Sequence, residues 1–200
     1  MGYSVMAYTI GVERLRRLFS QPEARAARTL RYVTRSGRGS IQSTNNNFED
    51  EIAEGCPPIE LALEQLLFGK PQHPDHAYMY GYALELICDA YGSFLNNHDW
   101  SGMPRSSYLE TVAEALDPTG SDAVRQLLYR GSPARAVPKA YEWPCIGYLE
   151  ESEISGELAR LTPEVMSALE DSSVRDTANR LRSWLELADD RGTGIVAFLY

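Results

Sequence analysis

The chain has 200 residues, of which 44% are hydrophobic and 24% are charged, close to the average for soluble globular proteins. This composition excludes a mainly disordered chain, a collagen-like repeat and a small disulfide-stapled protein. The net charge of −9 disfavours general nucleic-acid binding, because an acidic protein repels the phosphate backbone.

The opening of the chain is predicted to contain a strand and two helices. The predicted elements are a strand over residues 3–10 and helices over residues 12–19 and 23–35. Residues 36–48 are polar and lack any hydrophobic period, so we expect a flexible loop there.

The remainder is mostly helical in its pattern. Helices are predicted over residues 59–67, 77–95, 107–117 and 121–130. After a middle strand, further helices are predicted that end near residues 161 and 190. The middle strand covers residues 143–149 and a final strand residues 195–200. The final strand is apolar without alternation, which is typical of a central strand buried on both faces.

These elements predict an α+β fold. We expect a helix-rich single domain over residues 1–200, with a small mixed sheet built from the N-terminal, middle (143–149) and C-terminal (195–200) strands. The two ends of the chain are expected to pair or to lie near one another.

Two local patterns near the C-terminus add a resemblance. The step IGYLEESEI at residues 146–154 joins a strand to a helix, and ADDRGTG at residues 188–194 precedes the last strand. Over residues 1–20 and 143–200 the chain resembles the YfbM-like group of uncharacterised bacterial proteins. The resemblance implies the α+β fold and supplies no catalytic residue.

The three cysteines indicate the compartment. Their number is odd, and their spacing matches no C-x-x-C or zinc motif. We therefore expect reduced thiols in a cytoplasmic protein. No apolar run approaches 18 residues, so we expect neither a membrane span nor a signal peptide.

Motifs of common enzymes are absent from the sequence. It contains no phosphate-binding P-loop, no G-x-G-x-x-G, no H-E-x-x-H and no G-x-S-x-G. No cofactor or resident metal is predicted, and a non-catalytic role is favoured. An enzyme of an unfamiliar kind is left open.

Two weaker signals surround the predicted helix over residues 77–95. Asp75 and His76 precede it and are suited either to metal or acid–base chemistry or, for Asp75, to capping the helix. On the helix, Tyr78, Tyr82, Glu85 and Asp89 form a stripe. The stripe is suited to binding a cation, an amine or an arginine-rich partner, or it is simply a solvated face.

A third signal follows that helix. His98 and Trp100 lie in a polar segment, where an exposed tryptophan would suit a binding hot spot. A tryptophan packed against the core is the alternative.

A fourth signal is a set of arginines at helical spacing. Residues 1–40 carry eight arginines and two acidic residues, a balance of +6, whereas the rest of the chain carries −15. Arg25, Arg28, Arg31 and Arg35 lie within one predicted helix. They are suited either to contacting an acidic partner or phosphates, or to forming ion pairs on the protein's own surface.

Three functional hypotheses follow. The first is a non-catalytic protein-binding or regulatory module, for example one that neutralises a basic toxin as an immunity protein does. The second is an enzyme or small-molecule binder that uses a cleft of His, Asp, Tyr and Glu side chains. The third, less favoured, is nucleic-acid binding through the arginine face. The sequence does not indicate the oligomeric state.

Overall fold

The computed structural model describes residues 3–70, 72–103, 107–140 and 143–200. The chain divides into two compact units, each assembled from separate stretches. We call residues 1–12, 94–131 and 145–200 the sheet unit, and residues 13–93 and 132–144 the helical unit. Because the chain passes back and forth between the units, this division does not test the single-domain expectation, which stays a prediction.

The sheet unit is built around four strands in the order β2-β1-β4-β3. Their bounds are β1 Val5–Ile10, β2 Ser93–Leu95, β3 Cys145–Leu149 and β4 Gly194–Leu199. β4 pairs antiparallel with both β1 and β3. The α+β prediction is confirmed, as is the pairing of the two terminal strands, but the sheet is antiparallel rather than mixed.

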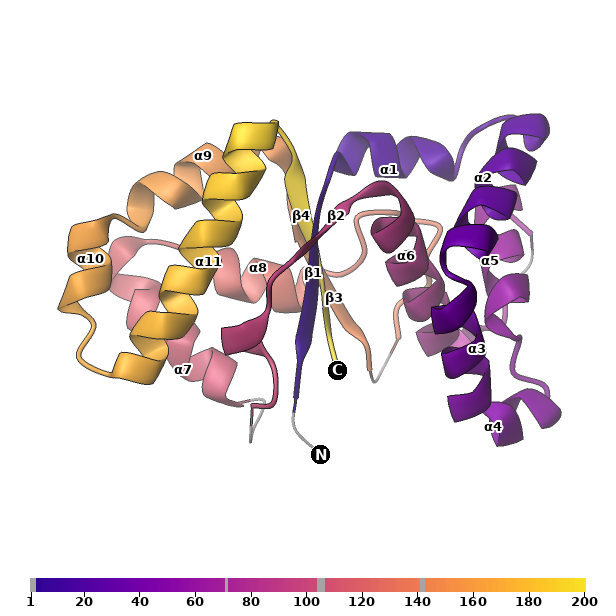
Figure 1. Ribbon diagram of the computed structural model, residues 1–200, viewed down its shortest axis with the longest axis horizontal. Coiled ribbons are helices and arrows are strands. Elements are labelled where there is room, and N and C mark those ends of the chain that lie inside the picture. The colour runs from indigo at the N-terminus through magenta and orange to yellow at the C-terminus, as the bar shows by residue number, and fades with distance from the viewer. Residues whose placement is uncertain (1–2, 71, 104–106, 141–142) are drawn as a thin grey trace. The chain divides into compact units, whose positions relative to one another are not determined.

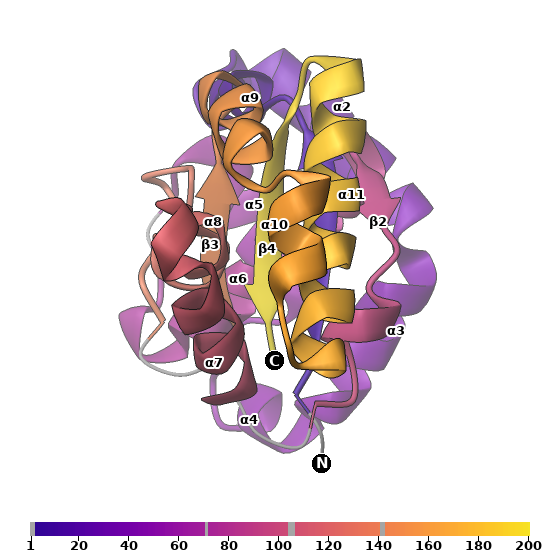
Figure 2. The same ribbon diagram turned by 90° about the vertical axis from the view of Figure 1, so that its left-hand side faces the viewer.

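Helices of the sheet unit cover one face of this sheet, as Figure 1 shows for α7, α8, α9, α10 and α11. Figure 2 views the same helices with β3 and β4 behind them. Their bounds are α7 Ser107–Leu116, α8 Ala123–Tyr129, α9 Glu151–Arg160, α10 Pro163–Ala168 and α11 Ser172–Arg191, with 3-10 turns at His98–Trp100 and Asp117–Thr119.

Alternate residues of the central strands fill the core against these helices. Val5 and Ala7 of β1 and Ile195, Ala197 and Leu199 of β4 are fully buried there. The intervening residues of β4 are buried as well, so the strand has no solvated face. This confirms that the apolar C-terminal run is a central strand.

The helical unit contains six α-helices within its described residues. Their bounds are α1 Val12–Leu18, α2 Glu23–Ser36, α3 Arg38–Asn47, α4 Glu49–Ala53, α5 Ile59–Phe68 and α6 Ala77–Tyr91. A 3-10 turn, Pro74–His76, precedes α6. α5 and α6 pack together through fully buried side chains, and α2 packs on both.

The predicted flexible loop at residues 36–48 is wrong, because this segment contains α3. Tertiary contacts stabilise a helix that its polar sequence does not predict. Ile41 is buried, and the amide of Asn45 accepts a hydrogen bond from the Ile59 N–H at 3.0 Å. The backbone at Gly37 also lies so close to Leu86 that a Cβ there would be 3.1 Å from the Leu86 side chain.

The predicted helix over residues 77–95 is too long. α6 ends at Tyr91, and Gly92 has an extended backbone conformation that stops it. Residues 93–95 form β2 instead, an edge strand with Leu95 buried. Pairing with β1 therefore replaces the last turn that the hydrophobic spacing predicts.

The backbones of α8 and β3 approach each other closely at Gly147 of β3. A Cβ built at Gly147 would lie 2.1 Å from the carbonyl oxygen of Gln126 and 2.3 Å from the carbonyl carbon of Leu127. The backbone of α8 therefore rests directly on β3, and only glycine leaves enough room.

Gly147→Ala is expected to lower the free energy of unfolding by about 3 kcal/mol or more, because backbone atoms of α8 cannot move aside as a side chain can. Urea unfolding followed by circular dichroism measures the change. Gly156→Ala is the matched control: its Cβ would meet nothing within 4 Å in α9, so stability should rise by up to about 1 kcal/mol. Equal stability of the two variants would contradict the packing argument.

Candidate functional site

The arginines of α2 lie opposite the side of the helix that packs into the helical unit. Ala26, Thr29 and Val33 are the buried residues of this helix. Arg28, Arg31 and Arg35 follow one another at i, i+3 and i+7, so helical geometry places them together on the opposite side. All three are exposed. The amphipathic pattern of α2 thus produces a basic outer face.

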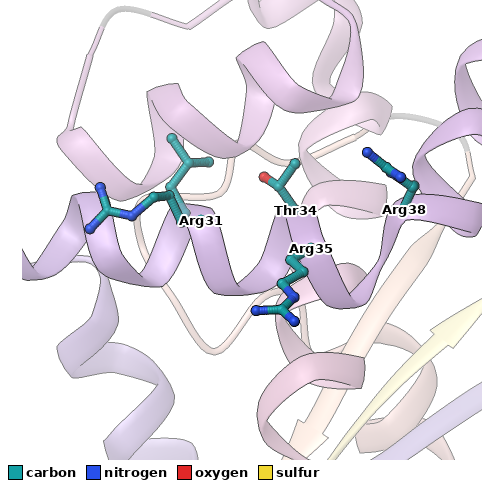
Figure 3. Close-up of a pocket in the computed structure, with 5 residues that line it drawn as sticks. Arg31, Thr34, Arg35 and Arg38 are labelled. Atoms are coloured by element: carbon teal, nitrogen blue, oxygen red, sulfur yellow. The ribbon is translucent and has the colours of Figure 1, made fainter.

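A hollow of about 600 Å³ lies along this face, which we call the arginine groove. It is lined by Leu30, Arg31, Thr34, Arg35 and Arg38. Figure 3 shows Arg31 and Arg38 on opposite sides of Thr34, with the three guanidinium groups pointing in different directions. The groups therefore do not converge on one atom-sized point, and the geometry suits several separate acceptors better than one small anion.

The side chains of Arg31, Arg35 and Arg38 form no ion pair or hydrogen bond with any part of the chain that the structure describes. Several arginines elsewhere are paired, for example Arg180 with Asp99 at 2.8 Å and Arg125 with Asp117 at 2.6 Å. The alternative in which the α2 arginines form surface ion pairs is therefore not what the fold adopts. Their donors remain available to a ligand.

The predicted stripe on α6 is partly covered. Phe48, between α3 and α4, packs its ring 5.3 Å from the ring of Tyr78 and 5.3 Å from that of Tyr82. Both tyrosines and Glu85 are half-buried, whereas Asp89 is exposed. Most of the stripe thus contributes to packing within the helical unit.

His76 and Tyr78 do lie together, beside a buried thiol. The Tyr78 hydroxyl donates to Cys56 Sγ at 3.4 Å and lies 3.5 Å from His76 Nδ1. Burial is the main cause that raises the pKa of both the Cys56 thiol and the Tyr78 phenol, and the nearby Glu51 charge raises both further. A raised pKa lowers the thiolate fraction, which disfavours the Cys56 thiol as a nucleophile.

Asp75 does not cap α6. The N-cap position is His76, and no side chain there accepts a backbone hydrogen bond. Asp75 is exposed in the 3-10 turn that precedes the helix. The turn takes over the start of the helix, which moves Asp75 away from the capping position.

His98 and Trp100 belong to the sheet unit, whereas the α6 residues belong to the helical unit. Trp100 is fully buried, which corrects its assignment as an exposed binding residue. Its ring lies 4.8 Å from that of Trp184, and its indole N–H donates to the Thr177 carbonyl at 3.0 Å. His98 is exposed beside it.

A further hollow of about 390 Å³ in the sheet unit contains the buried carboxylate of Glu157. The two oxygens of Glu157 accept hydrogen bonds from Ser121 at 2.6 Å and from Arg160 at 2.5 Å. These bonds satisfy the buried charge and join α9 to the turn before α8. The carboxylate therefore holds the fold together rather than facing a ligand.

Two kinds of feature are absent from the described ranges. No group of three or more His, Cys, Asp or Glu side chains is arranged to hold a metal ion there. Within the same ranges, no helix combines the length and the apolar character that crossing a bilayer requires.

The sequence pattern identified the arginines but not the rest of their groove. Leu30 and Thr34 also come from α2, whereas Arg38 begins α3, which the sequence did not predict. A missed helix conceals the side chains that it presents, so no local signal indicated that Arg38 joins Arg31 and Arg35.

A comparison with family models matches residues 1–200 to one described as "Domain of unknown function (DUF7691)". Comparisons with curated proteins and with solved structures found no match. The family match covers the whole chain but does not name the YfbM-like group, so that finer resemblance stays a prediction.

Alkylation with iodoacetamide at pH 8 is expected to modify Cys145 first, because Cys145 is half-buried whereas Cys56 and Cys88 are buried. Burial raises the pKa of all three thiols, so the thiolate fraction is small at pH 8 and each rate should keep rising above pH 9. Intact-mass spectrometry measures the adducts.

Cys145→Ser should remove the fast phase. The wild-type chain unfolded in guanidinium should take up three adducts. A fast adduct that maps to Cys56 in the folded protein would instead show an accessible, activated thiol beside Tyr78.

Proposed function

The chain belongs to the family described as a domain of unknown function (DUF7691), and we propose that it is a non-catalytic module that binds an acidic segment of a partner protein in the arginine groove. A regulatory role and a cytoplasmic location are parts of this proposal. The location is suggested by three free cysteines, which a reducing compartment keeps as thiols.

One observation carries the proposal: three arginines line one groove and have no partner among the described residues. Charge-assisted hydrogen bonds from arginine to carboxylate are short, often bidentate and stronger than neutral ones. Arginine and tyrosine are also enriched at binding hot spots, and Tyr32 is 51% exposed on the same helix. An acidic segment supplies the acceptors that this face lacks.

The charge of the surroundings favours a protein segment over nucleic acid. The helical unit contains eleven basic and twelve acidic residues in total, so the basic face is local and does not extend over the unit. A nucleic acid carries a negative charge at every nucleotide, so a strand that extends beyond the arginines would also lie against acidic surface and be repelled. A short acidic peptide segment needs only the groove itself.

The hypotheses of a basic partner and of a catalytic cleft receive less support. A basic partner was expected to contact the α6 stripe, but Phe48 covers both tyrosines of that stripe. The proposed catalytic cleft would use Tyr78, but its hydroxyl donates to the Cys56 thiol, and burial raises the pKa of both groups. Neither expectation has an observation comparable to the unpaired arginines.

The proposal is tested by panning a library of random 12-residue peptides displayed on phage. The wild-type protein should enrich sequences rich in Asp and Glu, and synthetic copies should bind by fluorescence anisotropy. The triple variant Arg31→Ala/Arg35→Ala/Arg38→Ala should bind these peptides at least about tenfold more weakly, because each of its three substitutions removes a charged hydrogen-bond donor.

Arg17→Ala is the matched control, since Arg17 is exposed on α1 and does not line the groove. Peptides that bind the triple variant as tightly as the wild type would refute the proposal, as would a library that yields no acidic binders.

A second measurement separates the nucleic-acid alternative. A 20-nucleotide single strand and a 20-base-pair duplex are expected not to bind at 25 mM salt, where electrostatic attraction is strongest. Binding that falls steeply with added salt and disappears in the triple arginine variant would favour the nucleic-acid hypothesis over an acidic protein segment.

A further inference from the structure

The arginine groove continues into a second hollow of about 560 Å³ in the same unit. Leu30 and Thr34 line both hollows, so the two adjoin along α2. The second is lined further by Asn45 of α3, by Pro58, and by Glu60, Leu61 and Glu64 of α5. A ligand that extends from the arginine groove across Leu30 and Thr34 therefore meets α5 next.

The chemistry changes from one hollow to the other. Leu61, 38% exposed, presents an apolar surface, and Glu60 beside it is an exposed carboxylate. Asn45 holds this carboxylate in place: its Nδ2 donates to Glu60 Oε2 at 2.8 Å while its Oδ1 accepts from the backbone of α5. Glu64 pairs with Lys70, so Glu60 supplies the net negative charge.

The opposite charges of the two hollows remain separate. Neither Glu60 nor Glu64 forms an ion pair with Arg31, Arg35 or Arg38 in the part of the chain that the structure describes. Leu30 and Thr34 lie at the junction. The combined surface is therefore basic at one end, apolar in the middle and acidic at the other end.

We infer that this surface selects a segment of matching charge order, with Asp or Glu side chains against the arginines, an apolar residue near Leu30 and Leu61, and a Lys or Arg against Glu60. This inference rests on the proposed function and deepens it, because it specifies the partner's sequence pattern. A uniformly acidic segment would bring a carboxylate against Glu60, where like charges repel.

The experiment uses the synthetic consensus peptide obtained by panning. The consensus should contain Lys or Arg on the side of its apolar residue away from the acidic residues. Replacing that residue by Glu should weaken binding to the wild type about fivefold, as expected for losing one exposed charge pair and adding a repulsion. The same Glu peptide should regain affinity for Glu60→Lys, because the pair is restored with its signs exchanged.

Two further variants are controls. Glu60→Gln keeps an acceptor for Asn45 and removes only the charge, so it should bind the Lys and Glu peptides about equally. Glu54→Lys changes an exposed carboxylate that lines neither hollow and should bind both as the wild type does. Circular dichroism checks that each variant folds.

The outcomes separate the two proposals. Acidic peptides that bind through the arginines without any preference at the Glu60 end would overturn the charge-order inference and leave the acidic-segment proposal standing. Failure of Glu60→Lys to favour the Glu peptide would also overturn the inference. Peptides that ignore both the arginines and Glu60 would overturn both.

Discussion

The sheet unit depends on the central position of β4. This strand pairs with β1 on one side and with β3 on the other, and all six of its residues are buried. Every polar backbone group of a buried strand must find a partner, so β4 requires both neighbours along its length. The C-terminal strand consequently ties the start of the chain and the segment after residue 144 into one sheet, on which α8 and α11 pack.

In the helical unit, the corresponding constraint is that polar side chains hold α3 against α5. Asn45 bonds both the backbone and a carboxylate at the start of α5, while Ile41 and Gly37 face inward. The same contacts place Arg38 next to the arginines of α2 and hold the Glu60 carboxylate at the second hollow. Packing that stabilises a polar helix thus also assembles the two ends of the proposed binding surface.

Three unpaired arginines that line one groove distinguish this surface from the charged groups that join elements of the fold. Glu157 is buried and satisfied by Ser121 and Arg160, and Arg130 bonds Glu153 while its guanidinium lies 4.2 Å from the centre of the Tyr148 ring. Those charges join elements of the fold. Arg31, Arg35 and Arg38 join nothing among the described residues, which is why we assign them a ligand rather than a structural role.

The sequence by itself determined the features that depend on local pattern. The unbroken apolar run at residues 195–199 indicated a buried central strand, and arginines at helical spacing indicated a basic face on α2, because periodicity alone places side chains on a side of a helix or strand. Only the tertiary structure decided that Trp100 packs against Trp184, that Phe48 covers Tyr78 and Tyr82, and that residues 38–47 are helical. These features depend on contacts between segments distant in sequence, which outweigh local preference and leave no periodic signal in the chain.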